Sequence, residues 1–239
     1  MEVDYILLFT KSQYFNKPPS SLVALFALGL MRIIPIMAIA PFFGAKILNK
    51  PAKVMFSVIL VFILYPKLLI SSPVIHFDIR FIALCLKEAV IGTSLGIFVS
   101  MPFYVMESSG TLIDHQRGAS SLMINDPYLQ AQNSPLGVLF NNLAIIIFFG
   151  IDGPIIFIET LSNSFDYIRV DQFLSKDFFD RSTPYYKTVV SLLTEEMALA
   201  IQLASPSLVA IFMTDMFLGI ANRLAPQVQI TFLGMPLKS

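Results

Sequence analysis

The chain of 239 residues is far more apolar than a soluble domain, with 56% hydrophobic and 13% charged residues and a mean hydropathy of +0.74. A soluble domain usually carries about a quarter charged residues. Basic and acidic residues number 16 each, so the net charge gives no support for nucleic acid as a partner. The composition therefore excludes an ordinary soluble enzyme and predicts an integral membrane protein.

Five long apolar segments predict an all-α protein with several membrane-associated helices. About 20 helical residues cross a bilayer, whereas barrel strands are short and alternate in polarity, which these segments do not. We expect one crossing from each of the first four segments. The last segment is long enough for one crossing and half of a second, and we expect the helix to break at Pro206. The segments are residues 22–43, 54–70, 81–106, 136–161 and 189–220.

Charges and prolines interrupt these apolar segments. A charge near the bilayer centre costs roughly 2.5–3.5 kcal/mol on insertion scales, so such side chains usually face protein or water. Prolines remove backbone donors, and neighbouring helices or water must then satisfy the freed carbonyls. We therefore expect kinked helical hairpins that are enclosed by other subunits or that line water. The charged residues are Arg32, Lys67, Lys87, Glu88, Asp152 and Asp215, and the prolines are Pro35, Pro66, Pro102, Pro154 and Pro206.

Small residues recur at four-residue spacing. Gly92 and Gly96 form a G-x-x-x-G pair, and Ala200 and Ala204 repeat the spacing. Such pairs let helices approach closely. We favour contacts within the chain over a specific dimer face.

Polar stretches connect the segments in what we interpret as one domain, residues 1–239. Residues 44–53 carry Lys46, Lys50 and Lys53 with no acid, which places this stretch in the cytoplasm by the positive-inside tendency. Alternation then puts the N-terminus outside and residues 107–135 inside. We interpret residues 107–135 as a structured polar connection packed against protein.

No enzyme signature is found, so we expect no catalysis, cofactor or metal. The sequence lacks G-x-S-x-G, H-E-x-x-H and a Walker-type glycine loop. Asp114 and His115 are adjacent and are followed by Ser120 and Ser121, but a catalytic triad needs rigid geometry that this spacing does not supply. Cys85 is the only cysteine, so no disulfide can form within the chain.

Asp152 lies in the sequence FFGIDGP and has two interpretations. A helix broken near mid-membrane beside an acid often marks an ion or substrate site, which would suit a small secondary transporter using Asp152 and Asp215. The alternative is a turn between two shorter helices, with Asp152 capping the second. No second copy of the motif supports a transporter repeat.

Several ordered motifs resemble a known family. They are RIIPIMAIAPFFG (32–44), ESSGTLIDHQRGASS (107–121), DPYLQAQNSPLGVLF (126–140), FFGIDGP (148–154) and ASPSLVAIFMTDMFLGIANRLAPQVQITFLGMPLKS (204–239). In this order and spacing, the chain from about Leu28 onward resembles the SctT/FliR family of the type III secretion and flagellar export apparatus.

The resemblance implies a structural, pore-forming subunit of a helical export gate in the bacterial inner membrane. Its implied partners are SctR-like and SctS-like gate subunits, a SctU-like switch subunit, membrane lipid and the unfolded proteins that are translocated. It also implies that the apolar helices are not all simple membrane crossings.

The resemblance marks candidate subunit-contact or gate residues, to which Asp152 is added from the residues themselves. We expect prolines and glycines to fix kinks and close approaches. We expect Asp114, Asp215 and Arg223 to bury polar contacts at subunit seams. The candidates are Pro35, Pro41, Phe43, Gly44, Gly110, Asp114, Gln116, Gly118, Asp152, Pro206, Asp215, Gly219, Asn222, Arg223, Pro226 and Gln227.

Two further expectations concern residues 107–135 and the C-terminus. We hypothesise that residues 107–135 help to close the gate, because their polarity and glycines suit a movable plug. Family members usually continue beyond the MPLK motif with another apolar segment, whereas this sequence stops at Ser239. Two interpretations stay open: the sequence is truncated, or this member lacks the final apolar helix. The number of spans and the side of the C-terminus depend on which holds.

Overall fold

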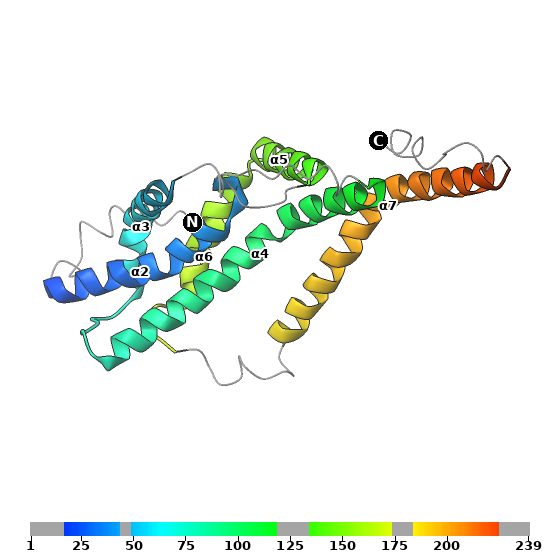
Figure 1. The fold of residues 1–239 in the computed structure, drawn as a ribbon. Helices are drawn as coiled ribbons and strands as arrows, with labels where there is room; N and C mark the ends of the chain where they lie inside the picture. Colours follow the sequence, from blue (N-terminus) through cyan, green and yellow to red (C-terminus); the bar gives the residue numbers. More distant parts are fainter. Residues whose placement is uncertain (1–16, 44–48, 119–133, 174–183, 225–239) are drawn as a thin grey trace. The chain divides into compact units, whose positions relative to one another are not determined.

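The computed structural model describes residues 17–43, 49–118, 134–173 and 184–224, and these residues are helical with no β-strand among them. Figure 1 shows the helices in chain order. They are α2 (Pro19–Ile39), the short 3₁₀ helix η2 (Pro41–Phe43), α3 (Lys50–Ser71), α4 (Ile79–Arg117), α5 (Pro135–Gly150), α6 (Gly153–Tyr167) and α7 (Pro184–Leu224). The predicted all-α class is confirmed.

The helices group into two compact units. Unit 1 is drawn from residues 1–100 and 148–183, and unit 2 from residues 101–147 and 184–239. The chain passes from one unit to the other within α4 and within α5, so each of these helices contributes to both. The expectation of a single domain stays a prediction.

The core of unit 1 is a pair of apolar helices, α2 and α3, packed against each other. Each begins with a proline in its first turn, where a missing N–H costs nothing. Their inward faces are buried at i, i+3, i+4 spacing, with Leu25 and Leu28 on α2 and Leu60, Val61 and Leu64 on α3. Burying one such side chain contributes about 1.5–3 kcal/mol when the alternative is water.

Two glycines on α4 let that helix pack closely against α2. A Cβ on Gly92 would lie 2.1 Å from the carbonyl oxygen of Arg32, and one on Gly96 would lie 3.1 Å from the Cα of Ile36. The backbones therefore approach more closely than any larger residue allows. The prediction that this G-x-x-x-G pair serves a contact within the chain is confirmed.

Unit 2 packs the C-terminal part of α4 against α5 and α7. Its apolar cluster holds Ile113 of α4 with Ala204 and Ile211 of α7, and side chains of Leu136 and Phe140 of α5 cover it. The small residue Ala204 is fully buried there. The prediction of close helix packing at the second small-residue pair is thus confirmed at Ala204.

The predicted segments correspond to the helices, with four corrections. Residues 107–117, expected in a connection, form the end of α4, and residues 50–53 form the first turn of α3. The segment 136–161 is divided between α5 and α6. Pro206 does not end a helix: it lies inside α7, whose ribbon bends partway along its length in Figure 1. A proline that deletes one backbone bond and crowds the preceding turn accounts for a bend without a stop.

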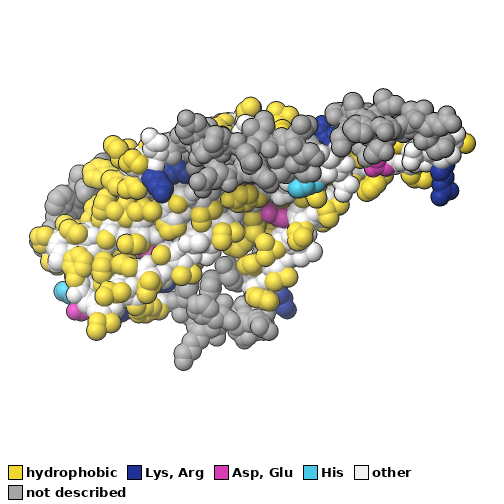
Figure 2. Space-filling model, viewed as in Figure 1, with side chains coloured by type: hydrophobic (Ala, Val, Ile, Leu, Met, Phe, Trp, Pro, Cys, Tyr) yellow, Lys and Arg dark blue, Asp and Glu magenta, His cyan; other side chains and the backbone are white. Residues whose placement is uncertain are grey.

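Much of the described surface is apolar. Figure 2 shows hydrophobic side chains over most of the described part of the viewed face, with few charged groups among them. Exposed examples include Phe62 of α3 at 72% and Met216 of α7 at 67%. Among the described helices, four are long and apolar enough to cross a membrane, and five crossings result if α5 and α6 form one bent span. The chain is a multi-pass membrane protein.

We expect Gly92→Ala to destabilise unit 1, because the added methyl group would collide with the backbone of α2 at Arg32. Overpacking of this kind costs about 1–3 kcal/mol. The measurement is thermal loss of helical circular dichroism in detergent. Gly150→Ala is the matched control, since nothing lies within 4 Å of a Cβ there. Equal melting of the two variants would contradict the close α2–α4 contact.

Candidate functional site

A cluster of three charged side chains lies at the centre of unit 1. Arg32 of α2 and Glu88 of α4 are both fully buried, and Lys87 is 7% exposed. Arg32 Nε donates to Glu88 Oε2 at 2.5 Å, and Lys87 Nζ lies 2.6 Å from Glu88 Oε1. The single carboxylate of Glu88 therefore pairs with two cations and offsets part of their positive charge. Buried charges need such a partner of opposite sign.

The two cations of this cluster also hold the end of α6. The Arg32 guanidinium donates to the carbonyl oxygens of Ser164 at 2.9 Å and Ile168 at 2.7 Å. Lys87 Nζ donates to the carbonyl oxygens of Arg169 at 2.8 Å and Gln172 at 2.9 Å. These carbonyls lie at and beyond the C-terminus of α6, where a cation is favoured. The Ser164 carbonyl also accepts the Ile168 N–H.

The Phe165 ring completes the environment of Arg32. The guanidinium carbon lies 4.1 Å from the ring centroid, within the range of a cation–π contact. The sequence marked Arg32, Lys87 and Glu88 as charges that must face protein or water, and they face protein. It did not pair them, and none was among the candidate contact residues.

Two further lysines act on helix ends in unit 1. Lys67 Nζ pairs with Asp166 Oδ2 at 2.7 Å and donates to the Ser162 carbonyl oxygen at 2.9 Å, which joins α3 to α6. Lys17 Nζ donates to the carbonyl oxygens of Leu69 and Ser72 at the end of α3, at 2.8 and 2.5 Å. Burial lowers the pKa of Lys17.

The motif RIIPIMAIAPFFG (32–44) has its two phenylalanines in an aromatic cluster of unit 1. The ring of Phe42 lies 4.4 Å from that of Phe148, and the ring of Phe43 lies 5.3 Å from that of Phe56 and 5.5 Å from that of Phe157. Pro41 is buried at the start of η2 and Pro35 lies inside α2. These residues pack within the unit. Gly44 lies outside the described residues.

Asp152 occupies a turn between α5 and α6. Its backbone has φ 58°, the left-handed region, and the helix axis bends by 77° at this break. A Cβ at Gly153 would lie 2.3 Å from the Phe148 ring, so glycine is required beside the turn. The turn interpretation is confirmed. The expected capping by the Asp152 side chain is wrong, because that exposed side chain makes no cap hydrogen bond and only its carbonyl accepts from α6.

Asp114 anchors the start of α5 in unit 2. Its buried carboxylate accepts from the Ser134 hydroxyl, from the Leu136 N–H at 2.9 Å and from Arg117 at 2.5 Å. One turn earlier, a Cβ on Gly110 would lie 2.6 Å from the backbone of Gly137. The donors at an α-helix N-terminus favour such an acceptor.

These contacts of Asp114 are made within the chain, while its expected place at a subunit seam stays a prediction. Adjacent His115 is exposed on the helix, and Ser120 and Ser121 lie outside the described residues. Gly118 follows α4 with φ +78°, as its glycine predicts, and Gln116 is exposed. Residues 119–133 lie outside the described residues.

The last motif occupies the second half of α7 and is little covered. Pro206, Gly219, Asn222 and Arg223 are exposed, and Asp215 is half-buried. Among the described residues, nothing beyond the neighbouring helix backbone lies within 4 Å of a Cβ built on Gly219. Pro226 and Gln227 lie outside the described residues.

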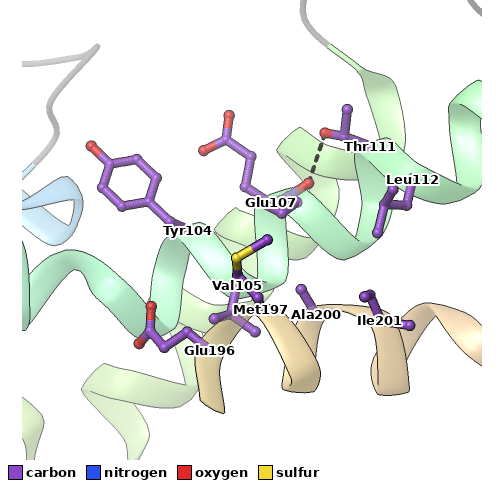
Figure 3. Close-up of a pocket in the computed structure, with 10 residues that line it drawn as sticks. Tyr104, Val105, Glu107, Thr111, Leu112, Glu196, Met197, Ala200 and Ile201 are labelled. Carbon is purple, nitrogen blue, oxygen red and sulfur yellow. Dashed lines mark hydrogen bonds between the residues drawn. The ribbon is translucent and has the colours of Figure 1, made fainter. Parts of the chain in front are cut away.

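A pocket of about 600 Å³ lies between α4 and α7 within unit 2. Figure 3 shows Tyr104, Glu107 and Leu112 on α4 and Glu196 and Met197 on α7. The lining is mostly apolar and holds neither a cationic side chain nor a histidine or cysteine. Across the described residues, no group of three or more His, Cys, Asp or Glu side chains could hold a metal ion.

Comparison with known proteins decides the family. Residues 23–239 match the bacterial export proteins, family 1. The chain belongs to this family. The match covers all the motifs that suggested the SctT/FliR family, and members of that family are bacterial export proteins of the inner membrane.

Individual relatives agree with this assignment. The chain is 28% identical to the surface presentation of antigens protein SpaR of Salmonella typhimurium, over 91% of this chain and 80% of the relative. It is 28% identical to the flagellar biosynthetic protein FliR of Bacillus subtilis, over 89% and 81%. It is 30% identical to the Yop proteins translocation protein T of Yersinia pestis, over 71% and 64%.

We expect Glu88→Gln to destabilise this export protein strongly, because Arg32 and Lys87 would remain buried without an anion. Removing one partner of a buried ion pair costs about 3–5 kcal/mol. The measurement is the melting temperature in detergent, followed by circular dichroism. Glu159→Gln on the exposed side of α6 is the control. A Glu88→Gln chain as stable as the control would show that the cluster contributes little.

We expect Asp114→Ala to loosen the start of α5, because Ser134 and Leu136 would each lose their acceptor. Each buried group left unsatisfied costs about 1–3 kcal/mol. Hydrogen exchange at residues 134–138 should rise, while exchange in α2 stays constant. Gln116→Ala, an exposed change in the same motif, should have no such effect. Unchanged exchange in the Asp114 variant would refute the anchoring role.

Proposed function

We propose that this chain is a structural, pore-forming subunit of a type III secretion export gate. It assembles with SctR-like and SctS-like subunits, lies beside a SctU-like switch subunit and serves the export of unfolded proteins across the bacterial inner membrane. The observation that carries the proposal is the family match over residues 23–239. The printed names of the relatives describe surface presentation, flagellar biosynthesis and translocation.

The physical character of the chain supports a structural role. Its buried charges are engaged in holding helix ends, as at Arg32 and Asp114, and serve packing. The lining of the pocket between α4 and α7 is mostly apolar and holds neither a histidine nor a cysteine. A large apolar surface remains exposed on α3 and α7. Lipid and partner subunits can both cover such a surface and so spare it contact with water, which is unfavourable for apolar side chains.

The deciding experiment is mass determination of the detergent-extracted chain after co-expression with SctR-like and SctS-like subunits from the same source. One copy of this chain in a stable hetero-oligomer is the expected result. Deletion of the gene should abolish secretion, and the wild-type chain should restore it. A particle that contains this chain alone, with no partner retained, would refute the proposed assembly.

A small secondary transporter that uses Asp152 and Asp215 is the competing function, and the 77° bend beside Asp152 is the feature that favours it. Asp152 is exposed at a turn and makes no side-chain cap, so a gate subunit should tolerate its loss of charge. We therefore expect Asp152→Asn to leave protein secretion within about twofold of wild type. The measurement is secreted substrate per cell. A secretion defect together with loss of ion-coupled solute uptake would favour the transporter.

A further inference from the structure

The ammonium group of Lys87 lies among four oxygen atoms at the end of α6. Its Nζ donates to the carbonyl oxygens of Arg169 at 2.8 Å, Val170 at 3.4 Å and Gln172 at 2.9 Å. An ammonium group has three donors, so these three carbonyls use all of them. Glu88 Oε1 lies 2.6 Å from the same nitrogen. We call the three carbonyl oxygens and Glu88 Oε1 the oxygen cage.

Glu88 contributes negative charge to the oxygen cage and accepts no hydrogen bond there. Its buried Oε1 has no hydrogen-bond donor among the described residues, which agrees with ammonium donors directed at the carbonyls. Its other oxygen, Oε2, accepts from Arg32. The cage therefore surrounds its occupant with four oxygens and a shared negative charge. Carbonyl oxygens coordinate a free monovalent cation in the same way when they replace its hydration shell.

The dimensions of the oxygen cage fit a monovalent cation and do not fit a divalent one. Its oxygens lie 2.6–3.4 Å from the central nitrogen. Ca²⁺ takes about six to eight oxygens at about 2.3–2.6 Å, and Mg²⁺ binds oxygens at about 2.0–2.1 Å. One carboxylate that is shared with Arg32 would also leave most of a double charge buried without an anion. Ammonium and potassium are the cations of suitable size and charge.

Contacts other than the ammonium hold the carbonyls of the oxygen cage in place. The Arg32 guanidinium donates to the Ile168 carbonyl oxygen at 2.7 Å. The Val170 side chain is 1% exposed. The Arg169 guanidinium donates to the Ser71 carbonyl oxygen at the end of α3. The segment that follows α6 is therefore fastened to α2 and α3 as well as to α4, so the cage should stay formed when the ammonium is removed.

The oxygen cage lies within reach of water. The side chains of Arg169 and Gln172 are exposed, and Lys87 lies near the start of α4. A small ion can therefore enter the cage once the lysine side chain no longer fills it.

We propose that the oxygen cage is a binding site for a small monovalent cation, ammonium or potassium, and that the Lys87 ammonium is its tethered occupant. The occupied cage locks the segment after α6 to α4. This site goes beyond the proposed export function and does not depend on it. If Lys87 served only as an ion-pair partner of Glu88, arginine would replace it and a free cation would not.

The test is Lys87→Ala in the full chain, purified in detergent and titrated with ammonium chloride against tetramethylammonium chloride at constant ionic strength. The melting temperature should fall, and hydrogen exchange in residues 168–172 should rise at least tenfold, because three buried carbonyls lose their donors together. Ammonium should restore at least half of the lost melting temperature and should saturate, and potassium should act in the same direction. Tetramethylammonium, which has the same charge and no N–H donor, should restore none.

Lys67→Ala is the matched control. Lys67 Nζ also contacts three oxygens, but only one is a backbone carbonyl and the other two belong to the side chains of Ser162 and Asp166. Side-chain oxygens relax when the lysine is removed, so ammonium should restore none of the stability that this variant loses. The wild-type chain should not respond to ammonium either, because its cage is occupied. Equal stabilisation of Lys87→Ala and Lys67→Ala by ammonium would overturn the proposal.

Lys87→Arg separates a cation cage from a simple ion pair. The variant keeps the positive charge but replaces a compact ammonium with a planar guanidinium, which does not suit a cage built around a point charge. It should melt below the Lys87→Ala chain measured in saturating ammonium. Wild-type stability of Lys87→Arg would overturn the proposal. So would a Lys87→Ala chain that ammonium does not stabilise, or one that fails to fold both with and without ammonium.

Discussion

The buried Arg32–Glu88–Lys87 cluster is the interaction on which the order of unit 1 depends. Three charges in an apolar interior are stable only when each finds a partner, and a single carboxylate serves both cations. The donors that remain are directed at the carbonyls that end α6. The cluster therefore ties α2, α4 and α6 together at one point. Moving α2 away from α4 would separate Arg32 from Glu88, and moving α6 would remove carbonyl acceptors from Arg32.

Close backbone contacts at glycines fix the distance between helices, whereas the buried charges fix their orientation. Gly92 lets α4 touch the backbone of α2, and Gly110 lets α4 touch that of α5. In lipid there is little hydrophobic drive to bring helices together, so contact distance and hydrogen bonds carry more of the association. Asp114 shows the two devices combined, since its carboxylate reaches the start of α5 one turn from the Gly110 contact.

The second half of α7 carries large exposed apolar side chains, among them Met213, Phe217 and Ile220. Hydrocarbon suits such side chains, whereas water does not. The membrane setting of the chain therefore explains why so much apolar surface is exposed in the described residues.

The sequence by itself determined the class of protein, the number of apolar segments and the family. Hydropathy and length act over whole segments, and ordered motifs identify relatives without knowledge of any contact. It also marked Arg32, Lys87 and Glu88 as charges that need protein or water, and Gly92 and Gly96 as a close contact. Only the tertiary structure decided that residues 107–117 are helical. The glycine and polar residues that suggested a connection instead serve contacts between helices, since Gly110 lies against Gly137 and Asp114 accepts the Leu136 N–H. The tertiary structure likewise decided that Arg32 pairs with Glu88 and holds the end of α6, since pairing across 56 and 132 residues depends on how helices pack and leaves no periodic signal in the chain.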